Sequence, residues 1–87
     1  MDWNACPRLT AGIEINQVPD GYVIYDPERD RVHYLNHTAV LLLELCDGRR
    51  KTVDLPHLLQ AVYDLPEAPV DEVSAYIKKL LDEGLIH

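Results

Sequence analysis

The 87-residue sequence lacks any long apolar run. A membrane-spanning helix needs roughly 20 consecutive apolar residues, and every apolar stretch in this chain is far shorter. The opening residues, MDWNACPRL, also lack the basic start and apolar stretch of a signal peptide. We therefore expect a soluble, cytoplasmic protein that has no membrane partner.

Cysteine is scarce as well, because the chain has only Cys6 and Cys46. Their wide separation does not fit the close Cys–Cys spacing of zinc sites, and the histidines add no matching pattern. We expect no metal site and no cofactor. Cys46 lies in an apolar run, which predicts a buried thiol. Two reduced cysteines are favoured over a disulfide between them.

Basic residues are few: 8 Lys and Arg stand against 15 Asp and Glu, and the formal net charge is −7. This balance argues against a surface built to neutralise phosphate, and so against nucleic acid as a partner. The sequence also lacks the residues of an active site. Its four glycines are scattered rather than gathered in a phosphate-binding loop, and Ser74 is its only serine. We therefore predict that the protein is not an enzyme.

What the chain does contain begins with three short strand patterns. Residues 13–18 alternate apolar and polar side chains, residues 22–25 are β-branched or aromatic, and residues 31–35 alternate again. Turn-forming residues separate them, PDG at 19–21 and DPERD at 26–30. Short connections of this kind predict an antiparallel meander. The first 12 residues show no period and are expected to be irregular.

Three helices are predicted after the strands. Asn36 is a suitable N-cap for an apolar helix that ends near Asp47-Gly48, and Asp54 for a second helix. The third helix is expected to run from Val70 to Gly84. Its apolar stripe follows helical spacing and consists of Val70, Val73, Ile77, Leu80 and Leu81. The element order predicts a single α+β domain over residues 1–87, a three-stranded antiparallel sheet followed by three helices, winged-helix-like in arrangement.

The stretch from the third strand into the first helix carries a recognisable motif. It reads Leu-Asn-x-Thr-Ala, then two bulky apolar residues, Leu-x-Asp-Gly and a Thr. The matching residues are Leu35, Asn36, Thr38, Ala39, Leu42, Leu43, Leu45, Asp47, Gly48 and Thr52. With the strand region before it and VDEVSAYIKKLLDEGLI after it, the chain resembles the PqqD-like family over residues 7–86. Members of this family are recognition elements of pathways that modify ribosomally made peptides. Leu43 departs from the family, since many members carry Trp there.

The resemblance implies a stand-alone, non-catalytic protein, a peptide chaperone that binds the leader segment of a precursor peptide. The partner implied is a separate maturation enzyme, either the leader peptidase of a lasso-peptide pathway or a radical-SAM-type modifying enzyme. The leader would add as a strand beside the third strand and pack against the third helix. The peptide-binding residues expected on this basis are Arg31, Val32, His33, Tyr34, Leu35, Val73, Ser74, Ile77, Lys78 and Leu81.

Several points stay open at this stage. A winged-helix DNA-binding regulator is the first alternative, although acidic residues surround Lys78 and Lys79 in the last helix. A homodimer that pairs its own edge strands is the second. Alternation puts Val32 and Tyr34 on one face of the sheet and Leu35 on the other, without showing which face is buried. The net charge favours a leader that carries some basic residues.

Overall fold

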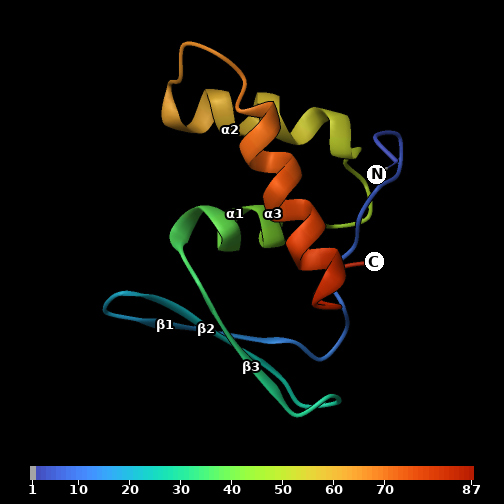
Figure 1. Ribbon diagram of the computed structural model, residues 1–87, viewed down its shortest axis with the longest axis vertical. Coiled ribbons are helices and arrows are strands. Elements are labelled where there is room, and N and C mark those ends of the chain that lie inside the picture. The colour runs from blue at the N-terminus through green and yellow to red at the C-terminus, as the bar shows by residue number, and fades with distance from the viewer. Residues whose placement is uncertain (1) are drawn as a thin grey trace.

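The computed structural model describes residues 2–87 and shows a three-stranded sheet followed by three helices (Figure 1). This confirms the predicted α+β arrangement. The strands are β1 (Glu14–Val18), β2 (Gly21–Asp26) and β3 (Arg31–Leu35). The helices are α1 (His37–Leu45), α2 (Leu55–Tyr63) and α3 (Val70–Asp82), with a short 3-10 turn (Thr52–Asp54) before α2.

The sheet is an antiparallel meander in the order β1-β2-β3. A two-residue turn joins β1 to β2, so that Val18 lies opposite Gly21. Four residues join β2 to β3 and place Asp26 opposite Arg31. The buried Asp26 carboxylate accepts a hydrogen bond from the Arg29 N–H at 3.3 Å and thereby holds this second turn. The meander leaves β3 at one border of the sheet.

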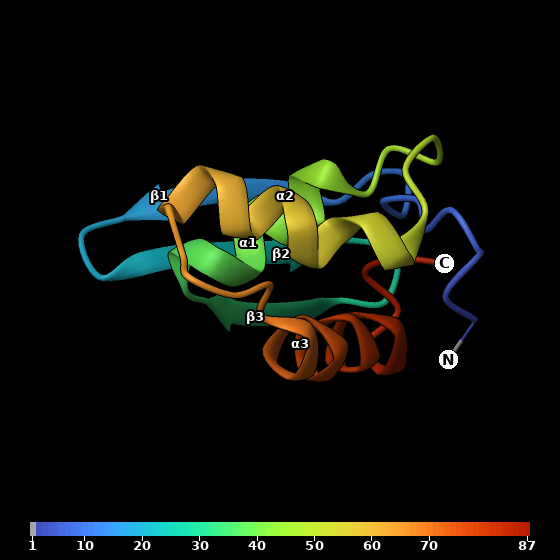
Figure 2. The same cartoon turned by 90° about the horizontal axis from the view of Figure 1, so that it is seen from above.

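Helices cover one face of this sheet, and the core lies between the two layers (Figures 1 and 2). Every strand and α-helix except β1 contributes at least one buried apolar side chain to it, and most contribute a fully buried one. The largest of these are Ile24, Leu42, Leu43, Leu55, Ile77, Leu80, Leu85 and Ile86. Leu43, the residue that departs from the motif described above, is completely buried.

The predicted helix ends are correct at α1 and only partly correct at α2. Asn36 caps α1, because its side-chain oxygen accepts a hydrogen bond from the Ala39 N–H at 2.9 Å. Asp54 occupies the N-cap position of α2, as predicted, but it does not cap the helix in the usual way. It ends the 3-10 turn with helical backbone angles, and its side chain makes no capping hydrogen bond. The 3-10 turn itself was not predicted.

The predicted stripe of α3 is right at its centre and wrong at its ends. Val73, Ile77 and Leu80 are buried, whereas Val70 and Leu81 are exposed. Gly84 ends the helix region with a φ of +73°. The tail that follows packs its Leu85 and Ile86 side chains into the core.

The segment before β1 has no regular strand, as predicted, yet it is tied to the rest of the molecule. Arg8 exchanges backbone hydrogen bonds with His87, at 2.8 and 2.9 Å. Ala5 accepts a hydrogen bond from the Thr52 N–H at 2.9 Å, and Leu9 donates one to Cys46 at 2.8 Å. Both cysteines are free thiols, and Cys46 is buried as expected.

Within residues 2–87, no helix combines the length and the apolar character that crossing a membrane requires.

Candidate functional site

The first component of the candidate site is the open border of β3, which pairs only with β2. Residues of an antiparallel pair alternate between hydrogen-bonded and non-hydrogen-bonded positions. A two-residue turn closes with a hydrogen-bonded pair, here Val18 and Gly21. When this alternation is followed from Gly21 along β2 and across to β3, the N–H and C=O groups of His33 point toward β2 and bond to Ile24. The N–H and C=O groups of Val32 and Tyr34 then point outward, where a further strand could pair with them.

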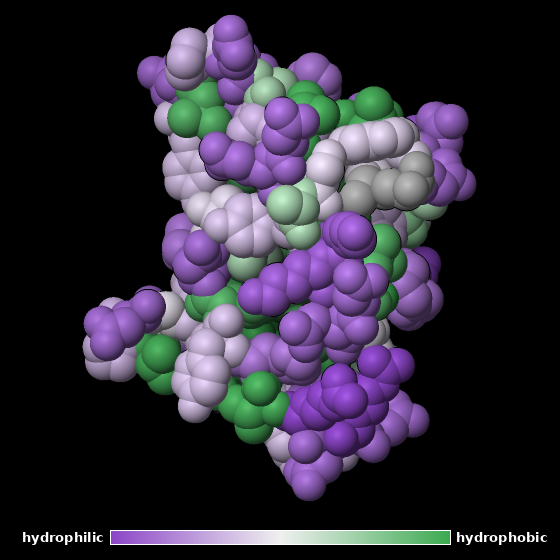
Figure 3. Space-filling model, in the orientation of Figure 1, coloured by the Kyte–Doolittle hydropathy of each residue, from purple (hydrophilic) through white to green (hydrophobic). Residues whose placement is uncertain are grey.

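The second component is a groove of about 470 Å³ between β3 and α3. All five residues of β3 line one side of it. The other side is formed by Lys79, Leu80 and Glu83 of the α3 region together with Leu85 of the tail. Figure 2 shows β3 and α3 running beside each other, and Figure 3 shows apolar atoms at the bottom of a hollow between polar side chains. An apolar floor with a polar rim lies directly beside the open strand.

Polar contacts tie β3 and its flanking residues to the α3 region at both ends of the groove. At one end, His33 Nδ1 lies 2.8 Å from the Glu83 carboxylate, and the Arg29 guanidinium donates to the Glu83 carbonyl at 3.3 Å. A carboxylate only accepts, so His33 Nδ1 carries the hydrogen of that bond. At the other end, the Asn36 amide donates to the Tyr76 hydroxyl at 2.9 Å. These contacts set the separation of strand and helix.

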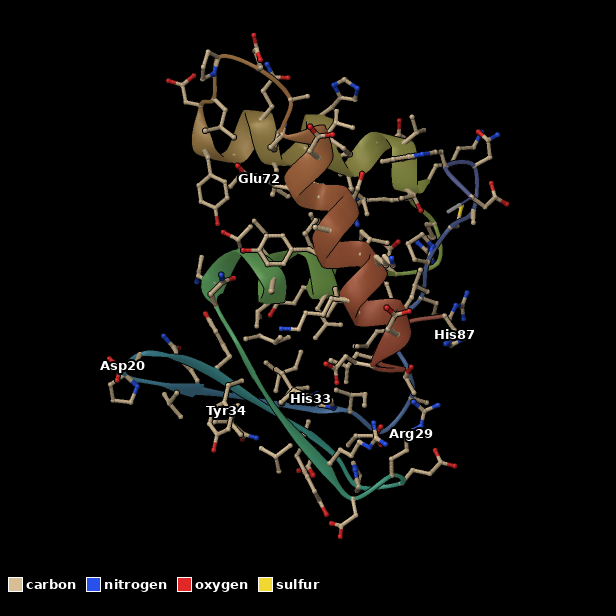
Figure 4. All side chains as sticks on the ribbon, viewed as in Figure 1. Asp20, Arg29, His33, Tyr34, Glu72 and His87 are labelled. Carbon is tan, nitrogen blue, oxygen red and sulfur yellow. The ribbon has the colours of Figure 1, made fainter. Side chains whose placement is uncertain are left out.

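The structure decides which face of the sheet is buried. Leu35 is 7% exposed and points into the molecule, whereas Val32 is 52% and Tyr34 78% exposed. Figure 4 shows His33 on the side of β3 near the end of α3 and Tyr34 on the opposite side. A strand added to β3 would therefore present alternate side chains to the groove and to the outer face.

The structure brings together the five predicted β3 residues but not the five predicted on α3. Val73 and Ile77 are buried in the core. The Ser74 hydroxyl donates to the Val70 carbonyl at 2.8 Å, one turn earlier in the same helix. Lys78 is exposed and does not line the groove. Leu81 lines a separate hollow beside the N-terminal segment.

Sequence reasoning missed the groove residues Lys79 and Glu83 and placed Leu80 in the core alone. A signal for them was present. Tyr76, Leu80 and Glu83 follow each other at helical spacing, one turn apart, and so share one face of α3. That face meets β3, but only the position of the sheet shows which face this is.

Two chemical possibilities for the described residues are a reactive cysteine at the buried thiol and a metal site formed by acidic and histidine side chains. Burial and the nearby Asp47 charge raise the pKa of the Cys46 thiol to about 12, so it stays protonated and unreactive at neutral pH. Residues 2–87 contain no group of three or more His, Cys, Asp or Glu side chains placed to hold a metal. The groove offers outward backbone groups, an apolar floor and a charged rim.

Comparison with known proteins agrees with this geometry. Residues 21–86, from β2 to the C-terminal tail, match the family model described as Coenzyme PQQ synthesis protein D (PqqD). The chain belongs to the PqqD family. The match confirms the resemblance drawn from the Leu35–Thr52 motif, and it contains both β3 and α3.

One curated PqqD relative is a PqqA binding protein from Bradyrhizobium diazoefficiens. It is 34% identical over 77 residues, which cover 87% of this chain and 73% of that protein. No solved structure matches the chain. Neither the PqqD family description nor the relative's name refers to DNA, so neither favours the DNA-binding alternative.

Proposed function

We propose that this PqqD-family protein binds the leader segment of a ribosomally made precursor peptide and delivers it to a separate maturation enzyme, without catalysing a reaction itself. The observation that carries the proposal is the open border of β3 beside a groove with an apolar floor. The name of the relative, a PqqA binding protein, supports a precursor peptide as the ligand. The encounter would take place in the cytoplasm, where such precursors are synthesised.

Strand addition explains how a small protein without a deep pocket binds a peptide. The outward backbone groups of Val32 and Tyr34 supply main-chain hydrogen bonds, which give affinity for any extended segment. The groove receives the side chains that point inward, and these give specificity. Leu80 and Leu85 lie beneath that surface and are themselves almost completely buried. The proposed peptide-binding residues are thus those of β3 together with Lys79, Leu80, Glu83 and Leu85.

The proposal predicts that Tyr34→Pro abolishes leader binding. Proline has no N–H, so this change removes one outward donor of β3, and it leaves the bonds to β2 in place. Binding is measured by fluorescence anisotropy with a labelled synthetic leader peptide of a candidate precursor. A folded Tyr34→Pro protein that binds with wild-type affinity would contradict strand addition at β3.

Two control variants separate the backbone effect from its alternatives. Tyr34→Thr removes the aromatic ring and keeps the N–H, so it should retain most of the affinity. Gln17→Pro makes the same substitution at an exposed residue of β1, on the other border of the sheet. The alternation that starts from Val18 also turns the Gln17 N–H outward. Gln17→Pro should therefore bind the leader as the wild type does.

Hydrogen exchange gives an independent test of the same site. On addition of the leader, the amides of Val32 and Tyr34 should gain protection, whereas that of Gln17 should not change. Protection at the β1 border instead would move the site to the other side of the sheet.

Delivery requires that the protein bound to its leader also binds an enzyme. The two candidates are a leader peptidase and a radical-SAM-type modifying enzyme. Analytical gel filtration of each enzyme, with the protein alone and with the protein–leader pair, distinguishes them. We expect a ternary complex with one enzyme. Formation of a complex with neither would remove delivery from the proposal and leave leader binding intact.

A further inference from the structure

The groove differs in charge from the molecule as a whole. The chain carries a formal net charge of −7. Yet two of its eight basic residues, Arg31 and Lys79, line this one groove, and Glu83 is the only carboxylate that does so. With His33 neutral, the formal charge of the lining is positive while the charge of the chain is strongly negative.

The two cations are available to a ligand, and the carboxylate is not. The Glu83 carboxylate is engaged by His33 Nδ1 at 2.8 Å. Within residues 2–87, the ion pairs of Arg and Lys involve Arg29 with Asp26 and Arg50 with Asp47, so neither Arg31 nor Lys79 has a carboxylate within 4.0 Å. Both side chains are exposed at the rim of the groove. Two exposed cations without an ion-pair partner among the described residues thus line the groove.

We propose that the groove selects a peptide strand that places an acidic side chain, Asp or Glu, between Arg31 and Lys79. This inference rests on the proposed function and specifies the chemistry of its ligand. Side chains of an added strand alternate between the two faces, so the selected acidic residue is one that points inward, toward the groove. Cations at a binding rim set specificity and the rate of encounter.

The positive charge of the groove favours an acidic residue in the bound peptide, whereas the negative net charge of the chain favours basic residues. The net charge acts over long distances and is screened by salt within a Debye length of about 8 Å under physiological conditions. Within the groove, the nearest charges dominate because the Coulomb energy falls with distance. An acidic residue in the bound stretch and basic residues elsewhere in the leader are compatible, since the second group would lie outside the groove.

The helix α3 offers a closely matched control for the test. Lys78 and Lys79 are neighbours, both are exposed, and each replacement by alanine changes the net charge equally. Only Lys79 lines the groove. A difference between Lys79→Ala and Lys78→Ala therefore reports the groove and not the overall charge. Arg49, an exposed residue that does not line the groove, is the corresponding control for Arg31.

The experiment uses the full chain and a displayed random peptide library, with peptides of about 12 residues so that a whole strand fits. Enriched peptides are synthesised with each Asp or Glu either kept or replaced by Asn or Gln. Their affinities are measured by anisotropy for the wild type and the four alanine variants, and exchange protection of Val32 and Tyr34 is recorded. We expect enriched peptides to contain an acidic residue. Its amide replacement, Lys79→Ala and Arg31→Ala should each weaken binding about twofold to fivefold, and Lys78→Ala and Arg49→Ala should not.

Two results would overturn the inference, and they separate it from the proposed function. If peptides protect Val32 and Tyr34 but show no acidic preference, or if Lys78→Ala weakens binding as much as Lys79→Ala, the acidic anchor is wrong and strand addition stands. If no peptide protects these amides, the proposed function is wrong and the acidic anchor falls with it.

Discussion

The side-chain oxygen and the side-chain nitrogen of Asn36 have separate roles. Its oxygen accepts from the Ala39 N–H and caps α1, while its nitrogen donates to the Tyr76 hydroxyl of α3. We predict that Asn36→Ala lowers the free energy of unfolding by about 1 kcal/mol or slightly more, mainly through loss of the cap. Tyr76→Phe removes only the second, exposed bond and should cost about 0.5 kcal/mol or less. Urea denaturation of both variants tests this, and equal losses would show that the cap contributes nothing.

Asp47 makes stability depend on pH. Hydrogen bonding from the Arg49 N–H at 2.9 Å lowers the pKa of this carboxyl below its usual value, and the Arg50 guanidinium at 2.9 Å lowers it further. A folded-state pKa below the unfolded one stabilises the fold above the unfolded pKa, about 3.9. That contribution is lost as the pH falls through the lowered folded value.

We therefore predict that Asp47→Asn is less stable than the wild type at pH 7 and that the gap closes as the pH falls below about 4. Urea titrations of both proteins across this range measure it. A constant gap at all pH values would mean that the carboxylate charge is not the cause. Arg50→Ala should lower the stability in the same pH range, although less, because the bond from the Arg49 N–H remains.

The turn between β1 and β2 requires glycine at position 21 for two reasons. Gly21 has a φ of +150°, and a Cβ atom there would lie 2.9 Å from the backbone oxygen of Leu35. Backbone cannot move aside as the end of a flexible side chain can. Gly12 also has a positive φ, +84°, but nothing lies within 4 Å of its Cβ position.

Gly21→Ala should consequently destabilise the protein by about 2–3 kcal/mol, since it combines backbone strain with a clash against the end of β3. Gly12→Ala carries the backbone strain alone and should cost about 1 kcal/mol. Thermal unfolding of the two variants checks the difference. Equal destabilisation would mean that β2 and β3 separate easily at Leu35, and the groove would then be softer than the structure indicates.

The strands and helices themselves were largely predictable, because each has a local cause. Alternation predicted β3 at its observed bounds, Arg31–Leu35, and the Asn36 cap predicted the start of α1. Asp54 shows the limit of such rules. Its residue type suits a cap, but the 3-10 turn before it gives it helical backbone angles and leaves its side chain without that hydrogen bond.

The groove was predictable only on its β3 side. A strand at the end of a meander has an open border whatever packs around it, so sequence order suffices. The α3 side depends on how the helix is rotated against the sheet. Periodicity identifies Val73 and Ile77 as one stripe, yet it cannot show that Lys79 rather than Lys78 faces β3. That choice follows from long-range contacts, such as the one between Asn36 and Tyr76.

The open border of β3 also bears on whether two copies of the protein associate. If the border is free in solution, the amides of Val32 and Tyr34 should exchange much faster than that of His33, whose N–H is assigned to β2. We predict this pattern at micromolar concentration, together with a monomeric sedimentation coefficient. Slow exchange at Val32 and Tyr34 with a dimeric sedimentation coefficient would instead mean that two copies pair these strands, and a leader would have to displace one copy to bind.

The polar ties between the β3 region and α3, through Glu83 at one end and Asn36 at the other, exist before any peptide arrives. If a peptide binds here as proposed, the protein side of the site is already ordered, and most of the loss of conformational entropy on association falls on the peptide. A macrocyclic β-hairpin that already holds the extended form should then bind more tightly than the linear peptide of the same sequence. Substitutions that further rigidify the protein should increase the affinity only slightly.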